Sequence, residues 1–254
     1  MNIDFHTHGK LSKKIPFSVS EFIESVKEAK ESGLDAIALT EHFNAVGFLD
    51  VYKSMDEHFP YQEDFYNVNG VQVFPGMEVD AKEGGHFLFI GTRENIRDFW
   101  YQLEPYQSKE NFLPIKEILS LAEPYSFLQI GAHPFRLSNS LTQHDSSVFN
   151  QLDALDLNAK DLYKMGIKMK DKLMMYSYEK DLPILAGSDT HHYLQYGSVV
   201  NRFHKECKTV DELKQVLRTD NYDLYISPHL EIKVKAATAI KKVLKSQCAE
   251  SSLS

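Results

Sequence analysis

Two histidines close an apolar run near the start of the chain. His6 and His8 are separated by one residue, in the sequence His-Thr-His. In extended backbone, residues i and i+2 point to the same face, so both imidazoles could bind one cation. Taken alone, the pair is explained equally well by two histidines that are hydrogen-bonded to protein groups. Metal binding therefore needs further candidate ligands.

Such candidates recur beside other apolar runs of the chain. The metal-capable side chains beside these runs are His6, His8, Glu41, His42, Glu78, His86, His133, Asp189 and His191. Burying groups of this kind without a partner is costly, so they are usually paired or bound to a metal ion. A metal site explains this repetition better than a series of unrelated histidines. Histidine combined with carboxylate, without cysteine, favours Zn, Mn or Fe.

The segments that carry these side chains alternate between short β-branched runs and longer amphipathic stretches, which is typical of an α/β fold. Strands are expected at 3–6, 36–40, 71–74, 87–90, 127–132, 154–158 and 183–186. Helices are expected after Ser18 and Thr209, which begin capping boxes, and at 114–122 and 161–179. The Gly84-Gly85 turn predicts a hairpin of 71–74 with 87–90. Because active sites form at the carboxyl ends of strands in such folds, we expect the metal-capable side chains to meet there.

The remaining segments show weaker patterns. Residues 43–69 are rich in Tyr, Phe, Asp and Glu and show no clear period, so we expect a long loop or insertion. A lysine-rich helix is expected after residue 236, with a disordered end over residues 249–254. Without an internal repeat or a linker, a single domain over residues 1–254 is the simplest expectation.

Composition restricts the class of protein further. The 254 residues are 43% hydrophobic and 25% charged, as in globular proteins, and the net charge of -8 disfavours stable binding to nucleic acid. No run approaches the ~18 apolar residues of a membrane-spanning helix. The first residues lack the pattern of a signal peptide, so a cytoplasmic protein is expected. Cys207 and Cys248 lie far apart, which favours reduced structural thiols.

In their order, the motifs of this chain resemble those of the polymerase and histidinol phosphatase (PHP) superfamily of metal-dependent phosphoesterases. They are Asp-Phe-His-Thr-His, Thr-Glu-His, Gly-Met-Glu, His-Phe-Leu-Phe-Ile-Gly, Ala-His-Pro and Gly-Ser-Asp-Thr-His, and they span Asp4 to about His191. The resemblance implies a distorted seven-stranded (β/α) barrel with its metal site at the C-terminal strand ends. It also implies a cluster of two or three divalent metal ions and an activity like that of histidinol phosphatase.

The resemblance assigns ligands to three metal ions. A first ion is bound by His6, His8, Glu78 and Asp189, a second by Glu78, His86 and His133, and a third by His42 and His191. The family usually has one more ligand, an Asp, His or Gln, where this chain has Lys13 or Lys14. Because an ammonium group cannot bind a metal ion, either the third site is weaker or empty, or Lys13 contacts the substrate phosphate.

Other polar side chains have candidate roles around the metal ions. Arg136 is expected to clamp a phosphate, with a plain surface position as the alternative. His192 could donate a proton to a leaving group. Asp4 and Glu41 are expected to orient ligand imidazoles, with ordinary hydrogen bonding as the alternative. Asn158 fits a role in substrate binding or in structure equally well.

These residues predict a metal-dependent phosphatase that acts on a small phosphomonoester, such as histidinol phosphate or a nucleotide. The hypothesis is that a metal-bound hydroxide attacks phosphorus, with Glu78 and Asp189 as the catalytic carboxylates. Arg136 and Lys13 would neutralise the phosphate oxygens.

Two alternatives remain open. One is an amidohydrolase-type enzyme that cleaves C–N or C–O bonds, although the sequence has no clear candidate for a metal-bridging lysine. The other is a noncatalytic binding module that metal ions stabilise. Lys13 at a usual ligand position favours such a module, whereas the eight retained ligand positions disfavour it.

Overall fold

The structure, a computed structural model, describes residues 1–251, with the side chains of residues 1–247. Its centre is an eleven-stranded sheet, in which nine strands follow the order β11-β10-β1-β2-β5-β6-β7-β8-β9. The strands are β1 (Asn2–Thr7), β2 (Ala36–His42), β3 (Tyr61–Gln62), β4 (Phe65–Val68), β5 (Val71–Asp80), β6 (His86–Ile90), β7 (Leu128–Ala132), β8 (Ala154–Asn158), β9 (Ile184–Gly187), β10 (Val199–Phe203) and β11 (Tyr222–Ile226).

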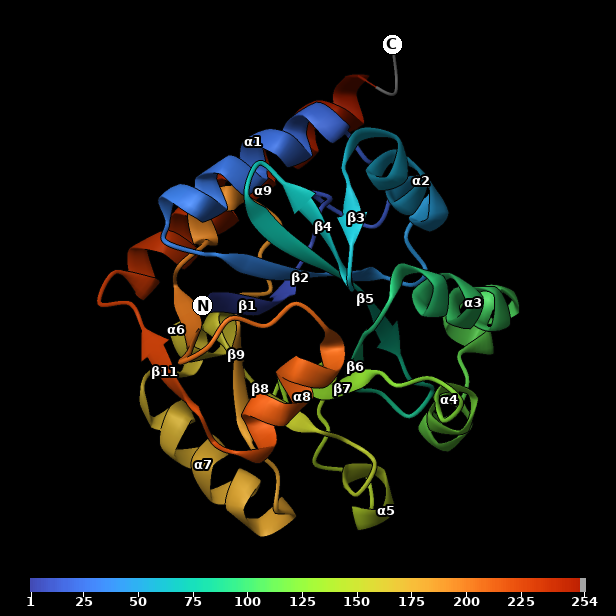
Figure 1. The fold of residues 1–254 in the computed structure, drawn as a ribbon, viewed down its shortest axis with the longest axis vertical. Coiled ribbons are helices and arrows are strands. Elements are labelled where there is room, and N and C mark those ends of the chain that lie inside the picture. The colour runs from blue at the N-terminus through green and yellow to red at the C-terminus, as the bar shows by residue number, and fades with distance from the viewer. Residues whose placement is uncertain (252–254) are drawn as a thin grey trace.

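Helices surround this sheet on its outer side (Figure 1). They are α1 (Val19–Glu31), α2 (Phe48–His58), α3 (Arg93–Leu103), α4 (Ile115–Ala122), α5 (Ser146–Phe149), α6 (Ala159–Met165), α7 (Lys168–Lys180), α8 (Val210–Arg218) and α9 (Leu230–Ser251). Three short 3-10 helices lie at Glu104–Tyr106, Lys109–Asn111 and Tyr193–Gln195. None of the described helices is long and apolar enough to cross a membrane.

Seven of the strands form a nearly closed barrel. Beyond the ladder from β1 through β2, β5, β6, β7 and β8 to β9, Thr7 pairs with Thr190 in a parallel bridge. The amide of His8 donates to the carbonyl of Thr190 over 3.0 Å, and the amide of Asp189 donates to the carbonyl of His6 over 2.7 Å. These bonds join the end of β1 to the segment after β9. The expected seven-stranded barrel is therefore confirmed, while β10 and β11 extend the sheet beyond β1.

One reversal of strand direction distorts the barrel and matters for the site. Strands β1, β2 and β5 are parallel, but β6 is antiparallel to both β5 and β7. Strands β5 and β6 form a hairpin as expected, but residues 76–80 of β5 make the pairs rather than 71–74, so that Asp80 lies opposite His86. His86 in turn lies opposite Ala132. Because β6 is reversed, its first residue lies beside the carboxyl ends of its neighbours. This reversal explains why His86 opens a strand whereas the other candidate ligands lie near the ends of theirs.

The interior of the barrel is apolar at the opposite end. Helix α8 closes that end with side chains that pack against inward-facing residues of the strands, and buried Cys207 belongs to the same cluster. The residues of α8 in this cluster are Val210, Leu213, Val216 and Leu217. As expected, Thr209 and Glu212 form a reciprocal capping box that fixes the start of α8. Ser18 likewise accepts a hydrogen bond from the amide of Glu21 at the start of α1.

Residues 43–69, expected as a long loop or insertion, contain regular structure and are not a loop. This segment contains α2 followed by the hairpin of β3 and β4, and β4 pairs with β5. Helix α2 buries Phe48, Val51, Tyr52 and Met55, which have the i, i+3, i+4, i+7 spacing of an amphipathic helix. The acidic and aromatic residues around this pattern obscure it in the sequence.

Three boundaries also differ from expectation. Strand β5 continues through Pro75-Gly76 to Asp80, so Glu78 lies within a strand rather than after one. The single helix expected at 161–179 is two helices, since Gly166 has a left-handed φ of 75° and separates α6 from α7. Helix α9 continues to Ser251, where a disordered end was expected from residue 249. Residues 252–254 lie outside the described part of the chain.

Tyr52 links α2 to the central strand, which generates a stability prediction. Its buried hydroxyl donates to the carbonyl of Gly76 over 2.6 Å and accepts from the amide of Gly76 over 3.0 Å. Tyr52→Phe leaves both backbone groups without this partner, so we expect the free energy of unfolding to fall by about 1–3 kcal/mol. Urea denaturation measures this loss. Tyr101→Phe, at a side chain that is 58% exposed, is the control and should change little; equal stability of the two variants would contradict the account.

Candidate metal centre

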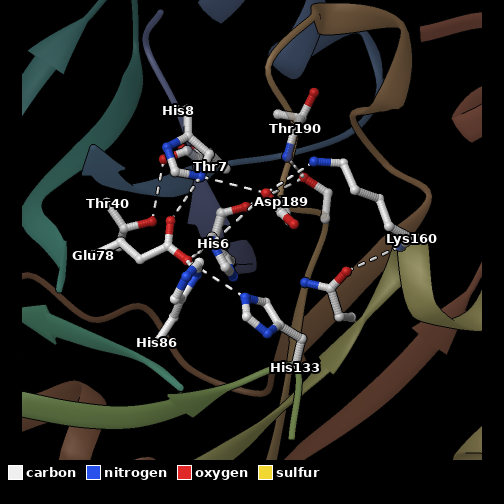
Figure 2. A network of polar contacts seen from close by, with 12 residues as sticks. His6, Thr7, His8, Thr40, Glu78, His86, His133, Lys160, Asp189 and Thr190 are labelled. Carbon is white, nitrogen blue, oxygen red and sulfur yellow. Dashed lines mark hydrogen bonds and ion pairs between the residues drawn. The ribbon is translucent and has the colours of Figure 1, made fainter. Parts of the chain in front are cut away.

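The eight side chains that the resemblance implies as ligands meet at one end of the barrel. Figure 2 shows the side chains of His6, His8, Glu78, His86, His133 and Asp189 directed toward one another. They come from β1, β5, β6 and the segments that follow β1, β7 and β9. His42 from the end of β2 and His191 from the segment after β9 complete the set. All are buried except His191, which is half-buried.

Their nitrogen and oxygen atoms form three groups, each compact enough to surround one metal ion. The groups are His6 with His8 and Asp189, Glu78 with His86 and His133, and His8 with His42 and His191. Within each group, the candidate ligand atoms lie within 4.8 Å of one another. This partition differs from the three ligand sets implied by the PHP resemblance in two ways: Glu78 falls in the second group alone, and His8 also adjoins the third group.

Glu78 lies at the centre of the cluster. Its carboxylate is within 3.6 Å of nitrogens from five imidazoles, which belong to His6, His8, His42, His86 and His133. One oxygen faces His86 and His133, and the other faces His8 and His42. A carboxylate placed in this way could bridge two metal ions.

The charges in the cluster are strongly coupled. Burial favours the neutral acid of Glu78, but His42, His86 and His6 hold its pKa well below the ordinary value. Burial likewise opposes the charge of His6, yet Glu78 and Asp189 raise its pKa to about 10. The carboxylates are thus ionised and attract positive charge. Metal cations at the same place would interact favourably with them.

Other imidazoles of the cluster stay neutral and keep a free lone pair. Burial, reinforced by the charge of Arg136, lowers the pKa of His133 to about 3. Burial also holds the pKa of His191 well below its ordinary value, and neighbouring His8 acts in the same direction. A neutral imidazole is the form that binds a metal ion.

Several buried nitrogen and oxygen atoms of the cluster, which could act as metal ligands, have no hydrogen-bond partner among the described residues. They include Nε2 of His6, both ring nitrogens of His8, Nδ1 of His42, Nδ1 of His133 and Oε2 of Glu78. Buried polar groups are almost always satisfied, so a group of unsatisfied ones at a single place requires an explanation. Histidine nitrogens and carboxylate oxygens match the ligand preference of Zn, Mn or Fe. The residues therefore fit a cluster of divalent metal ions.

The backbone is strained at two of the candidate ligands. His133 has φ of 33° and Asp189 has φ of 53°, both in the left-handed region that residues with a side chain seldom adopt. Such conformations cost roughly 1–3 kcal/mol and concentrate at functional sites. His133 directly follows β7, and Asp189 lies two residues after β9. In this backbone conformation both side chains point into the cluster (Figure 2).

Acidic side chains around the cluster hold it in place. Asp156, which the sequence analysis missed, accepts hydrogen bonds from Nδ1 of His6 over 3.1 Å and from the amide of His133 over 3.3 Å. Asp156 and Asn158 alternate on β8 and face the same side, and this alternation was the available signal. Glu41 lies 3.6 Å from Nδ1 of His8, beyond hydrogen-bond distance, so its expected role in orienting that imidazole stays a prediction.

Asp4 and Asn158 have structural roles in the described residues. Asp4 accepts from the amides of His6 and Ser188, so it holds the backbone of the ligand strands rather than an imidazole. Asn158 caps α6 through the amide of Lys160 and also donates to Asp156 over 2.9 Å. Both side chains fix the strand ends from which the ligands project.

Two cations contact Asp189. Arg136 donates to Asp189 over 2.9 Å, and its other nitrogens bind Asp161 and Asn158. Lys160, which the sequence analysis also missed, lies 2.9 Å from the second oxygen of Asp189. Because Lys160 is the second residue of α6, which directly follows β8, its place after a strand end was a usable signal. Arg136 lies at the site as expected, with its guanidinium engaged by protein side chains.

The last two expected residues lie at the edges of the cluster. Lys13 binds Asp80 over 2.9 Å, and the other oxygen of Asp80 lies 2.9 Å from Nε2 of His86. Lys13 is therefore near the cluster, on the side of the second group. His192 accepts a hydrogen bond from the amide of Leu194 and lines a small cavity next to His191.

Comparison with known proteins now decides the family. The sequence matches the PHP domain over residues 4–229, nearly the whole chain. The chain belongs to the PHP family. This membership confirms the resemblance read from the six motifs and supports a hydrolytic enzyme. None of the proteins of curated function matches the sequence significantly.

Solved structures similar to this PHP chain share its fold at low sequence identity. PsfC from Pseudomonas syringae has a TM-score of 0.75 at 17% identity, and the similarity covers 96% of this chain and 98% of PsfC. The lesion-specific endonuclease Q of Pyrococcus furiosus has a TM-score of 0.65 at 23% identity over 88% of this chain and 57% of that protein. A Bifidobacterium adolescentis protein inferred to be a metal-dependent phosphoesterase has a TM-score of 0.52 at 12% identity over 85% and 95%.

The sharing of His8 between two groups generates a prediction about metal content. Because His8 adjoins two of the three groups, His8→Ala should weaken the binding of two metal ions. The bound metal should fall by at least one ion per chain. Elemental analysis after metal loading and dialysis measures the content. His144→Ala is the control, since the His144 ring faces the carbonyl of Gly84 and lies in none of the groups. Unchanged metal in the His8 variant would refute the shared position.

Proposed function

We propose that this PHP chain is a metal-dependent phosphatase that hydrolyses a small phosphomonoester. The observation that carries the proposal is the arrangement around Glu78, where five imidazoles surround one buried carboxylate. Three groups of ligand atoms in contact suit a reaction in which charge develops on several oxygens of one phosphate. Histidinol phosphate and nucleotides are the first substrates to test.

The proposed ligands are the eight residues of the cluster. His6, His8, Glu78 and Asp189 would hold a first ion, Glu78, His86 and His133 a second, and His42 and His191 with His8 a third. When bound, divalent ions supply Lewis acidity and an activated water at neutral pH. Zn, Mn or Fe fits the donor set, and two or three ions fit the groups.

The remaining residues of the site position the ligands and the substrate. Arg136 holds Asp189 in place and retains N–H groups of its guanidinium that can bind a phosphate oxygen. Asp156 fixes the ring of His6. Lys13 is close enough to the second group to contribute positive charge at the rim. We retain Glu78 and Asp189 as the essential carboxylates.

A small substrate is favoured over a polynucleotide. The net charge of -8 opposes the approach of a long polyanion. The likeness to endonuclease Q is one of fold and covers 57% of that protein, so the remainder of the nuclease has no counterpart in this alignment. A DNA duplex nevertheless belongs in the test panel, because a phosphodiester would satisfy the same metal ions.

The test is phosphate release from a panel of phosphomonoesters that includes histidinol phosphate, nucleoside monophosphates and phosphotyrosine. We expect release from at least one compound with Mn or Zn, and loss of that release with a chelator. Release that a chelator leaves unchanged would contradict a metal-dependent mechanism. Cleavage of the DNA duplex alone would overturn the choice of a small substrate.

Glu78→Gln tests the central carboxylate. We expect kcat to fall at least ~100-fold. The variant loses the negative charge of the Glu78 carboxylate, which lies between the groups of metal ligands, but keeps the shape of the side chain. Circular dichroism checks that the fold is retained. Glu57→Gln, at an exposed glutamate on α2, is the matched control. A Glu78 variant with near-normal kcat would reject the assignment.

A further inference from the structure

We propose that a second anion-binding subsite adjoins the metal centre, formed by Lys160 of α6 and Lys241 of α9. The subsite would select phosphomonoesters that carry a second anionic group, either a carboxylate or another phosphate. This inference rests on the proposed phosphatase function and specifies the class of substrate. Lys160 contacts the ligand Asp189, whereas Lys241 makes no hydrogen bond or ion pair with a metal ligand in the described part of the chain.

The two lysines line a cavity of about 220 Å³. It lies between α6, the segment after β9 and α9, and His191 and His192 contribute to its wall. Whole small-molecule sites usually occupy roughly 300–1,000 Å³, so this cavity fits one group of a substrate rather than an entire ligand. Because His191 also belongs to the third ligand group, the cavity adjoins the metal centre.

The charge of this cavity is opposite to that of the protein. Lys160, Lys164 and Lys241 line it, and none of its described lining residues is a carboxylate. The whole chain carries a net charge of -8. Asp189 pairs with Lys160 from outside this lining. Three lysines in a wall without a carboxylate, in such a chain, indicate a site for an anion.

Lys241 lacks a partner in the described part of the chain. Its amine makes no hydrogen bond or ion pair with the described residues, whereas Lys160 contacts Asp189 over 2.9 Å. Burial and the charge of Lys160 lower the pKa of Lys241 to about 7. An anion bound between the two amines would offset the repulsion between their positive charges.

Helix α9 directs Lys241 inward. Val234, Ala237 and Lys241 follow the i, i+3, i+7 spacing of one helical face, and the first two are buried. A lysine therefore occupies a position of the packed face where an apolar residue would be expected. The PHP match ends at residue 229, before α9 begins at Leu230. The subsite is thus supplied partly by an element outside the matched domain.

The subsite lies close to the site of the reacting phosphate. Lys160 Nζ is 3.5 Å from Nδ1 of His191, and the ring of His191 stacks on that of His8 at 4.1 Å between centroids. One molecule can reach both places only if a short linker joins its two anionic groups. The predicted substrate is therefore a compact phosphate ester with a second negative group near the first.

Binding of phosphonates tests the subsite without requiring turnover, because a C–P bond is not hydrolysed by a phosphatase. The probes are propylphosphonate, with one anionic group, 3-phosphonopropionate, with an added carboxylate, and ethane-1,2-diphosphonate, with a second phosphonate. Calorimetry with the full chain should show at least one of the doubly anionic probes binding about tenfold more tightly than propylphosphonate. The probe that gains affinity distinguishes a carboxylate from a phosphate as the second group.

Variants at α9 separate the subsite from general charge effects. Lys241→Gln should abolish the preference for the doubly anionic probe, and Lys241→Arg should retain most of it. Lys242→Gln, at the exposed neighbour, is the control and should leave the preference intact. Circular dichroism checks the fold of each variant.

The outcomes for the subsite and for the proposed function can be distinguished. No preference in the unaltered protein, or a preference that survives Lys241→Gln, would overturn the subsite even if phosphate esters are hydrolysed. A preference lost in Lys241→Gln, in a protein that hydrolyses none of the esters, would uphold the subsite and contradict the phosphatase function.

Discussion

The carboxylate of Glu78, buried among five imidazoles, is the feature on which the site depends. A single carboxylate cannot balance several protonated imidazoles, and neutral imidazoles leave buried lone pairs unsatisfied. Divalent cations would resolve both problems, because each would bind neutral imidazoles through their lone pairs and take the place of the protons. The barrel brings the ligands together, since the bridge between Thr7 and Thr190 joins the two ends of the nearly closed sheet. It places the end of β1 beside the ligands after β9. The reversal of β6 then places His86 at the same end.

Much of this site was predictable from local sequence. Side-chain alternation placed His6 and His8 on one face, and the positions of the other ligands beside apolar runs predicted that they would meet. The order of the motifs carried the family, which the domain match confirms. These inferences succeeded because the end of a strand is a local property, whereas the carboxyl ends of parallel strands gather in space through the fold itself.

The parts that sequence reasoning missed depend on contacts between distant segments. Asp156 reads as an ordinary strand residue until β8 faces His6 across the barrel. Lys160 reads as a surface lysine until α6 brings it to Asp189. The apolar spacing of α2 was present in the sequence, but its flanking acidic and aromatic residues hid it. Lys241 lies on α9, beyond the recognised motifs, so only the packing of that helix reveals its position beside the metal centre.

Anomalous X-ray diffraction from crystals of the protein loaded with Mn or Zn tests the central claim most directly. The account predicts strong anomalous peaks among Glu78, His86 and His133 and among His6, His8 and Asp189, with a third peak beside His42 and His191 if that position is filled. Absence of peaks in the first two groups of a folded, metal-loaded protein, or peaks only elsewhere on the surface, would contradict it.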